Sequence, residues 1–152
     1  MKGHAIGYRT LLVPYDFSSH ADAALATALD LAARFESEVH LLHVLQQPIY
    51  ATAGYDGFPL DVPQDIKRHV CESLARLAAK SGRRVRAHVI DGTSIADRIG
   101  DSAQQLGADL IVMGTHGRTG LAHAFVGSVA ERTLRIAPCP VLTVRARERE
   151  AA

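Results

Sequence analysis

The stretch that decides the fold is Leu110-Ile111-Val112-Met113-Gly114-Thr115-His116-Gly117-Arg118-Thr119-Gly120, with Gly127-Ser128 a few residues further on. The four apolar residues at its start predict a buried strand, and the glycines that follow predict a loop. Beyond the loop, Val129, Ala130 and Leu134 have helical spacing, so a helix is expected to begin at Gly127-Ser128. A strand, a glycine loop and a helix N-terminus in this order bring backbone amides together where they can bind one anion.

The rest of the chain repeats this alternation of strand and helix. Apolar runs predict further strands at residues 10–13, 39–45, 85–90 and 141–144. Helical spacing predicts a helix after Ser18 or Ser19, a second that ends near Gly82, and a third that carries Ile95, Ile99 and Leu106. Such alternation predicts the α/β class: a single-domain, doubly wound sheet of five parallel strands with helices on both faces.

Two strand orders fit this pattern. The order 3-2-1-4-5 places the fourth strand beside the first, so that Asp16 and the glycine loop flank one crevice. The order 2-1-3-4-5 pairs the first strand with the third instead, which ends in Asp91-Gly92. The glycines favour the first order, because ligands of such sheets bind beyond the carboxyl ends of the strands, where the strand order reverses.

Composition sets the background for this crevice. The chain has 152 residues, of which 47% are hydrophobic, and this predicts one domain over residues 1–152. The formal net charge of +1 gives no overall field for nucleic acid or for an anionic membrane. No apolar run approaches the roughly 20 residues of a membrane span, and the two cysteines have no metal-type spacing, so we expect a cytoplasmic protein without nucleic-acid or membrane partners. Residues 46–62 are expected to form a long flexible loop and residues 145–152 a charged tail.

The spacing of the glycines excludes two common phosphate-binding motifs. The chain contains no Gly-Lys pair, which excludes a P-loop, and no G-x-G-x-x-G dinucleotide fingerprint. What remains is G-x-x-G-x(9)-G-S, from Gly114 and Gly117 to Gly127 and Ser128. With this motif the chain resembles the ATP-binding subgroup of the universal stress protein family. The segments Pro14-Tyr15-Asp16-Phe17-Ser18, Leu41-Leu42-His43-Val44 and Ala137-Pro138-Cys139-Pro140-Val141-Leu142 extend the resemblance over most of the chain.

The resemblance implies a Rossmann-like fold, similar to the adenine nucleotide alpha hydrolases, and a site for ATP, with Mg²⁺ allowed but not required. It implies that Asp16 and Val44 hold adenine, that Pro14 and Gly114 approach the ribose, and that Tyr15 and Met113 line the same crevice. Phosphate contacts fall on Gly117, Gly127, Ser128 and Val129, with added charge from Arg118 and from His116 or His123. Missing Cβ atoms at the glycines are expected to let phosphate approach the backbone. One departure is Ala130, where many ATP-binding relatives carry a hydroxyl residue.

Several of these residues also have a purely structural interpretation. The glycines fit turns, and Asp16 fits a turn or a cap after the first strand. Ser128 forms S-x-x-E with Glu131, which is a capping box that needs no ligand. His40 and His43 lie three apart on a predicted strand and so point to opposite faces, which favours packing or hydrogen bonding over a shared metal.

Three functions stay open at this point. The first is an ATP-dependent regulatory module of the stress response that an unknown protein partner reads. The second is a slow ATP hydrolase or phosphotransfer enzyme, for which we assign no catalytic residue and no metal ligand. The third is an interaction protein that binds no nucleotide. For each of them we expect a homodimer through the apolar edge strand at residues 141–144, because such an edge is normally protected or paired.

Overall fold

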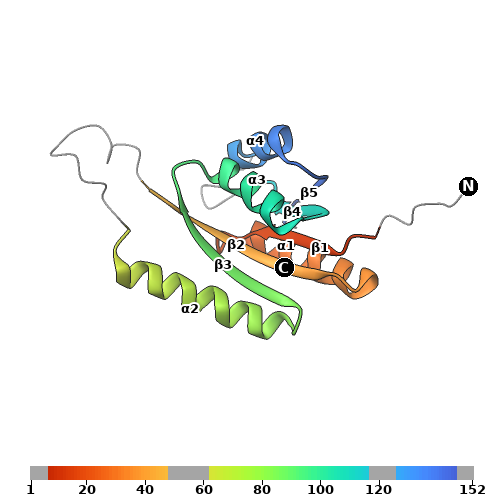
Figure 1. Cartoon of the computed structure of the whole chain (residues 1–152), viewed down its shortest axis with the longest axis horizontal. Coiled ribbons are helices and arrows are strands. Elements are labelled where there is room, and N and C mark those ends of the chain that lie inside the picture. The colour runs from red at the N-terminus through yellow and green to blue at the C-terminus, as the bar shows by residue number, and fades with distance from the viewer. Residues whose placement is uncertain (1–6, 48–61, 117–125, 147–152) are drawn as a thin grey trace, which may run out of the picture.

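A computed structural model describes residues 7–47, 62–116 and 126–146 of the chain. Strands and helices alternate through these residues, as predicted (Figure 1). The elements are β1 (Thr10–Pro14), α1 (Ser19–Phe35), β2 (Glu38–Gln46), α2 (Gln64–Ser81), β3 (Val85–Gly92), α3 (Ile95–Leu106), β4 (Leu110–Gly114), α4 (Ser128–Ile136) and β5 (Val141–Val144). Most of the predicted loop, residues 48–61, and most of the predicted tail, residues 147–152, lie outside the described residues.

The strands form one five-stranded parallel sheet in the order β3-β2-β1-β4-β5. This confirms the predicted order 3-2-1-4-5 and excludes the alternative order 2-1-3-4-5. β1 lies at the centre, where Leu11, Leu12 and Val13 are fully buried. A strand that is covered on both faces must be apolar on both faces, which explains its continuous apolar run.

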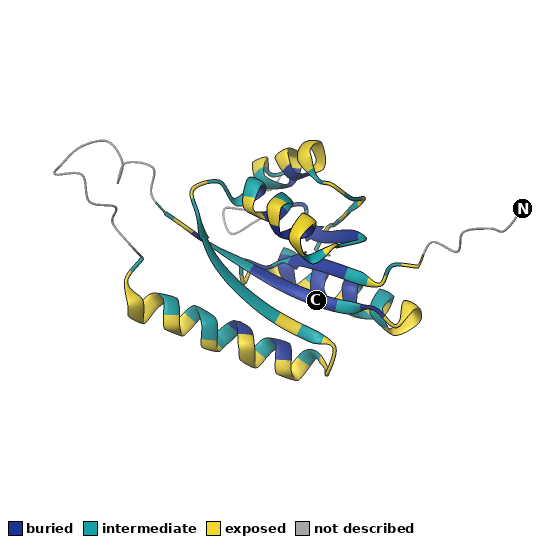
Figure 2. Cartoon of the chain, in the orientation of Figure 1, coloured by how far each residue is buried: buried dark blue, intermediate teal, exposed yellow. Residues whose placement is uncertain are grey.

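Helices cover both faces of the sheet (Figure 2). Alternate residues of β1 belong to different layers. Leu11 and Val13 pack in a core cluster with residues of α1 and α2, whereas Leu12 packs in a second cluster with residues of α3 and α4. The period of two along the strand therefore divides the core into two layers. The predicted doubly wound architecture is confirmed.

Helix ends follow the capping residues of the sequence. Ser18 caps α1 by accepting a hydrogen bond from the amide of Ala21, with 3.2 Å between the atoms. Ser94 caps α3 in the same way through the amide of Asp97. Gly107 ends α3 at φ 62°, a left-handed conformation that glycine adopts without a steric penalty.

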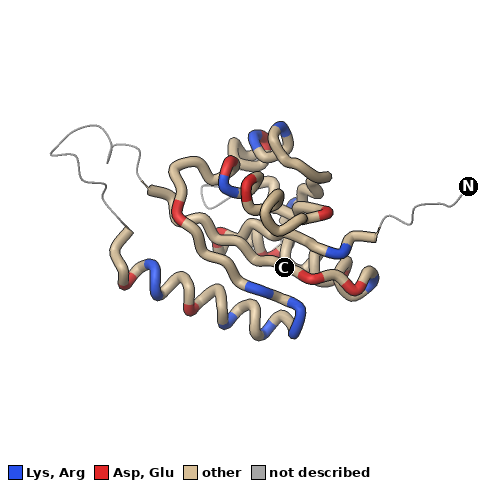
Figure 3. The backbone as a smooth tube through the Cα atoms, in the orientation of Figure 1, with Lys and Arg blue, Asp and Glu red and all other residues tan. Residues whose placement is uncertain are grey.

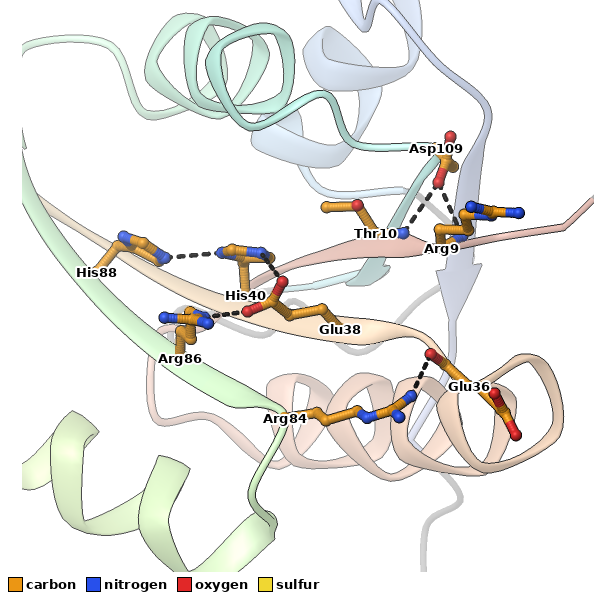
Figure 4. Close-up of polar contacts among 9 residues, drawn as sticks. All are labelled: Arg9, Thr10, Glu36, Glu38, His40, Arg84, Arg86, His88 and Asp109. Carbon is orange, nitrogen blue, oxygen red and sulfur yellow. Dashed lines mark hydrogen bonds and ion pairs between the residues drawn. The ribbon is translucent and has the colours of Figure 1, made fainter.

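Polar contacts join the strands near their amino ends (Figure 4). The carboxylate of Asp109 accepts hydrogen bonds from the amides of Arg9 and Thr10, at 2.8 and 2.9 Å, and so ties the start of β4 to the start of β1. Between β2 and β3, His40 Nδ1 lies 2.9 Å from His88 Nε2. Arg86 forms an ion pair with Glu38 across the same two strands. These contacts occupy the amino end of the sheet, and the carboxyl end is left for a site.

Candidate functional site

A cleft of about 530 Å³ opens at the carboxyl ends of β1, β2 and β4. This volume lies within the usual range of small-molecule sites. Two of the predicted site residues, Gly117 and Arg118, lie outside the described residues, as does His123. Every predicted site residue that the structure describes lines the cleft: Pro14, Tyr15, Asp16, Val44, Met113, Gly114, His116, Gly127, Ser128 and Val129.

One end of the cleft lies where β1 separates from β2. The register of the two strands ends at Pro14 and Leu42, and the amide of Tyr15 donates a last hydrogen bond of 2.8 Å to the Leu42 carbonyl. Backbone groups two residues apart in a strand point to the same side. The N–H and C=O of Val44 therefore point to the side of β1, past the end of the paired register and toward the cleft that Val44 lines.

Asp16 lies in a tight turn between β1 and α1. Its Oδ1 accepts a hydrogen bond of 3.0 Å from the amide of Ser18, so the structural interpretation of this residue is confirmed. The turn does not remove Asp16 from the cleft, which it also lines. Phe17 follows at φ 65°, in the left-handed region that bulky side chains rarely occupy.

The N-terminus of α4 forms the other end of the cleft. Gly127 is the N-cap and no side chain caps this helix, so the predicted capping box is wrong. Ser128 is the first helical residue instead, and Glu131 forms an ion pair with Arg135. The first amides of a helix have no partner within it and carry the positive end of its dipole. Gly127, Ser128, Val129 and Ala130 all line the cleft, so this helix end suits an anion.

Two glycines of the motif lie close to other parts of the protein itself. A Cβ atom on Gly114 would lie 2.7 Å from the Cβ of His20, and one on Gly127 would lie 3.1 Å from the carbonyl oxygen of Thr115. That carbonyl also accepts a 2.7 Å hydrogen bond from the amide of Gly127. At these two positions the missing Cβ makes room for the chain itself, and the approach of phosphate to the backbone stays a prediction.

Two histidines of the cleft hold defined hydrogen bonds. Nδ1 of His43 donates to the Tyr15 carbonyl at 2.7 Å, so the predicted hydrogen-bonding role of this histidine is confirmed. Nδ1 of His116 lies 3.0 Å from Oγ1 of Thr115. The ring of His116 also lies near that of His20, with 5.3 Å between the centroids. Within the described part of the chain, the buried Nε2 of His116 has no hydrogen-bond partner.

Tyr15 is buried beside the cleft and its hydroxyl donates a hydrogen bond to Asp22. Burial raises the pKa of Tyr15 far above its ordinary value, and the hydrogen bond and charge of Asp22 raise it further, with a smaller contribution from Asp16. Tyr15 therefore stays neutral and acts as a fixed hydrogen-bond donor. It braces the segment from β1 into α1 and has no role as a base.

Charge in the cleft is sparse. The residues that line it include Asp16 but no lysine or arginine from the described segments. Figure 3 shows basic residues gathered where α2 leads into β3, at the amino end of the sheet.

The described segments contain no cluster of three ligating side chains able to hold a metal ion. Among the described helices, none has the length and apolarity that a membrane span needs.

Sequence reasoning missed the contribution of α3. Ile95 and Ile99 line the cleft from this helix, and Gln46 lines it from the end of β2. A signal for Ile95 was present, because it closely follows Asp91-Gly92 at the end of β3. The carboxyl ends of parallel strands share one edge of a sheet, so a helix that starts there faces the same crevice.

Comparisons with known proteins agree with the observed fold. The model of the universal stress protein family matches residues 7–145. A curated universal stress protein of Methanocaldococcus jannaschii is 32% identical over 94% of this chain and 85% of its own length. The solved structure of UspA from Lactobacillus plantarum is 25% identical, with a TM-score of 0.68 over 91% of this chain and 98% of that one. A universal stress protein from Archaeoglobus fulgidus, solved in complex with dAMP, shares the fold at 23% identity and a TM-score of 0.63, over 90% of this chain and 98% of that one.

Proposed function

This chain belongs to the universal stress protein family, and we propose that it is a member that binds ATP or a closely related adenine nucleotide in the cleft at the carboxyl ends of β1, β2 and β4. The observation that carries the proposal is the arrangement of the two ends of the cleft. One end combines the carboxylate of Asp16 with the backbone of Val44, and the other is the N-terminus of α4. A base needs directed hydrogen-bonding groups such as those at the first end, and a phosphate chain needs an anion-binding surface such as the helix N-terminus at the second.

The end at Asp16 and Val44 suits adenine. A backbone N–H and C=O from one residue offer a donor and an acceptor side by side, and adenine presents the complementary pair on one edge of its ring. The carboxylate of Asp16 accepts from the exocyclic amino group. Apolar side chains of Leu42, Ile95 and Met113 line the same cleft and supply surface for the rings.

The end at α4 suits phosphate. The amides of Ser128 and Val129 belong to the first turn of the helix, where backbone donors are free and the dipole favours an anion. The described cleft residues bring no basic side chain except imidazole, so backbone amides supply most of the recognition there. Gly117 and Arg118, which the family resemblance assigns to phosphate, belong to the same proposal, and Mg²⁺ would accompany the phosphates as a counter-ion.

We base the regulatory role on the residues to which the cleft assigns a function. We assign no general base among the described cleft residues, and Asp16 is assigned to adenine. We therefore propose that the nucleotide is a signal that an unknown protein partner reads, and that hydrolysis is slow or absent. The A. fulgidus protein was solved in complex with dAMP. For this chain, we base the nucleotide site on the cleft that its own residues form.

The direct test is to release any bound nucleotide from the purified protein with acid, identify it, and titrate the emptied protein by calorimetry. We expect ATP to bind and GTP to bind far more weakly, because guanine reverses the donor and acceptor on the edge that Val44 meets. The same samples, incubated with Mg²⁺, report any product of hydrolysis. A protein that binds no adenine nucleotide at millimolar concentration would contradict the proposal.

Ser128→Pro tests the phosphate end through the backbone alone. Proline is tolerated at the first position of a helix, and the preceding Gly127 at φ −60° and ψ 152° already has the conformation that a following proline requires. The substitution deletes one amide donor, and we expect about tenfold or greater loss of ATP affinity, since a hydrogen bond to a charged group is worth about 1.5–3 kcal/mol.

Two control variants make this result interpretable. Gln64→Pro places proline at the first position of α2, far from the cleft, and should leave binding unchanged. Ser128→Ala keeps the amide and removes the hydroxyl, and so reports the side chain separately. Equal ATP affinity for Ser128→Pro and the parent would show that this amide does not meet phosphate.

We further propose that the protein is a two-fold dimer through β5. This strand is an edge of the sheet, and an apolar edge invites pairing. Leu142 on β5 and Leu134 and Ile136 on α4 are exposed apolar side chains in this part of the molecule. A partner copy would cover them.

A further inference from the structure

We propose that His43 ends the β1–β2 ladder and thereby creates the edge that reads the base, which makes the site selective for 6-aminopurines over 6-oxopurines. This inference rests on the proposed nucleotide site and assigns it a positioning residue that lies outside the glycine motif. His43 acts through the backbone of its neighbours. It is the hydrogen bond of its ring, and not a contact with the ligand, that carries the effect.

The regular ladder predicts a different partner for the Tyr15 carbonyl. In a parallel pair, a residue whose amide donates to one residue of the neighbouring strand accepts from the residue two positions further along that strand. Tyr15 donates to the Leu42 carbonyl, so its own carbonyl is due to accept from the amide of Val44. In the structure this carbonyl accepts from Nδ1 of His43 at 2.7 Å, and the paired register ends one residue earlier, at Pro14.

The consequence for Val44 is that its amide is available to a ligand. A side-chain donor has replaced a backbone donor on the Tyr15 carbonyl, and the displaced donor lies on a residue that lines the cleft. A backbone donor buried in protein requires a partner, and a ring nitrogen of a base supplies one. The same hydrogen bond fixes the peptide group between Tyr15 and Asp16, and so helps to position Asp16, which lines the same cleft as Val44.

The strained conformation of Phe17 supports the same arrangement. Of the two described non-glycine residues with positive φ, Glu36 is the left-handed cap of α1, whereas Phe17 caps nothing. Its ring contacts the rings of Tyr15 and His43, with centroids 5.2 and 5.3 Å apart. Backbone strain at the rim of a cleft persists when its surroundings over-determine it. Here the ring packs against the imidazole that holds the Tyr15 carbonyl.

The class of base follows from the charges and donors at this edge. In adenine, the ring nitrogen beside the amino group accepts a hydrogen bond and the amino group donates to the carboxylate. In hypoxanthine, the same ring nitrogen carries a proton and the amino group is replaced by a carbonyl oxygen. A 6-oxopurine would therefore set a donor against the Val44 amide and an acceptor against Asp16, and sites built on hydrogen bonds reject such mismatches strongly.

The test compares the affinities of ATP and ITP in the parent protein, His43→Leu and His43→Asn. We expect the parent to prefer ATP by about 100-fold or more, and His43→Leu to lose about tenfold of this preference, as expected for one displaced hydrogen bond. In that variant the Val44 amide can pair with the Tyr15 carbonyl and close the edge. His43→Asn should keep the preference within about threefold, because the side-chain amide of Asn can donate from nearly the same place as Nδ1.

His40→Leu is the matched control. It lies on the same strand and also loses a hydrogen-bonded imidazole, but its partner is His88 on β3, away from the cleft. Its ratio of ATP to ITP affinity should equal that of the parent even if its stability falls. Urea unfolding of all variants separates loss of fold from loss of selectivity. If His43→Leu does not fold, Phe17→Asn tests the ring contact instead, since Asn tolerates positive φ, and its ratio should fall about threefold.

The outcomes separate this inference from the function on which it rests. A parent protein that binds neither ATP nor ITP contradicts the proposed function itself. A parent that prefers ATP, together with a folded His43→Leu or Phe17→Asn variant that keeps the full preference, overturns only the role of His43. Loss of preference in His43→Leu with retention in both His43→Asn and His40→Leu supports it.

Discussion

Gly114 shows that a residue recognised as part of a binding motif can also be needed for packing. Gly114 belongs to the glycine pattern that indicated phosphate binding, yet the space of its missing Cβ is filled by His20 of α1. The close approach brings α1 onto the end of β4. Gly114 therefore contributes to the site indirectly, because it sets the distance between the strand end and the helix beside it.

Gly114→Ala is expected to destabilise the fold by about 1–3 kcal/mol, the usual cost of overpacking. The added Cβ would lie 2.7 Å from the Cβ and 2.9 Å from the backbone carbon of His20, and a backbone atom cannot move aside alone. Urea unfolding measures the change. Gly100→Ala is the control: its Cβ would meet Ile136 at an ordinary 3.8 Å, and alanine within a helix is favoured over glycine by about 0.5–1 kcal/mol. Equal stabilities for Gly114→Ala and the parent would disprove the tight contact.

At the scale of elements, β2 and β3 are joined by a pair of histidines as well as by their ladder. The rings of His40 and His88 stack with centroids 5.1 Å apart. Burial lowers the pKa of both imidazoles. The neighbouring His88 and Arg86 lower the pKa of His40 further, Arg86 also lowers that of His88, and Glu38 opposes the shift in both. The folded protein therefore resists protonation of this pair.

Stability is accordingly expected to fall as the pH drops below about 6.5, the usual pKa of an unfolded histidine. Below that pH the unfolded chain binds protons that the folded pair does not, so the unfolded state is stabilised and the free energy of unfolding decreases. Urea midpoints at pH 8 and pH 5.5 measure the effect above the range where carboxylates titrate. The double variant His40→Leu, His88→Leu should show a smaller difference between the two midpoints than the parent does. A parent midpoint that rises on acidification would refute this.

The strands show which features of the fold could be predicted from the sequence and which could not. Apolar runs predicted every strand, because buried parallel strands must be apolar, but they placed the end of the third strand at Ile90. In the structure β3 continues to Gly92, since Asp91 and Gly92 pair with Leu45 and Gln46 in the register of β2. Pairing across strands leaves no signal in a single segment. For the same reason the sequence found the glycines and Asp16 but not the hydrogen bond from His43 that shapes the base end of the cleft.

The whole molecule presents one edge of its sheet at β5, and we expect light scattering to report a dimer. Leu142 is 38% exposed on this edge. Leu142→Lys should shift the mass toward the monomer, because a charge at an edge opposes strand pairing. Phe35→Lys is the control, since Phe35 is similarly exposed, at 41%, on α1. A dimeric Leu142→Lys variant would place the interface elsewhere.

Because β1 lies at the centre of the sheet, the sheet can form completely only late in synthesis. β1 leaves the ribosome first among the strands, yet its second neighbour is β4, and Leu11 meets Leu110 only after most of the chain has been made. The carboxylate that joins the amides of Arg9 and Thr10 belongs to Asp109, which lies 100 residues after Arg9. During synthesis, one side of β1 therefore stays unpaired and part of its apolar surface stays uncovered until β4 has been made. Such surfaces are prone to aggregation, and chaperones can protect them. A nascent chain stalled before residue 110 has the first strand, but not the sheet that this strand organises.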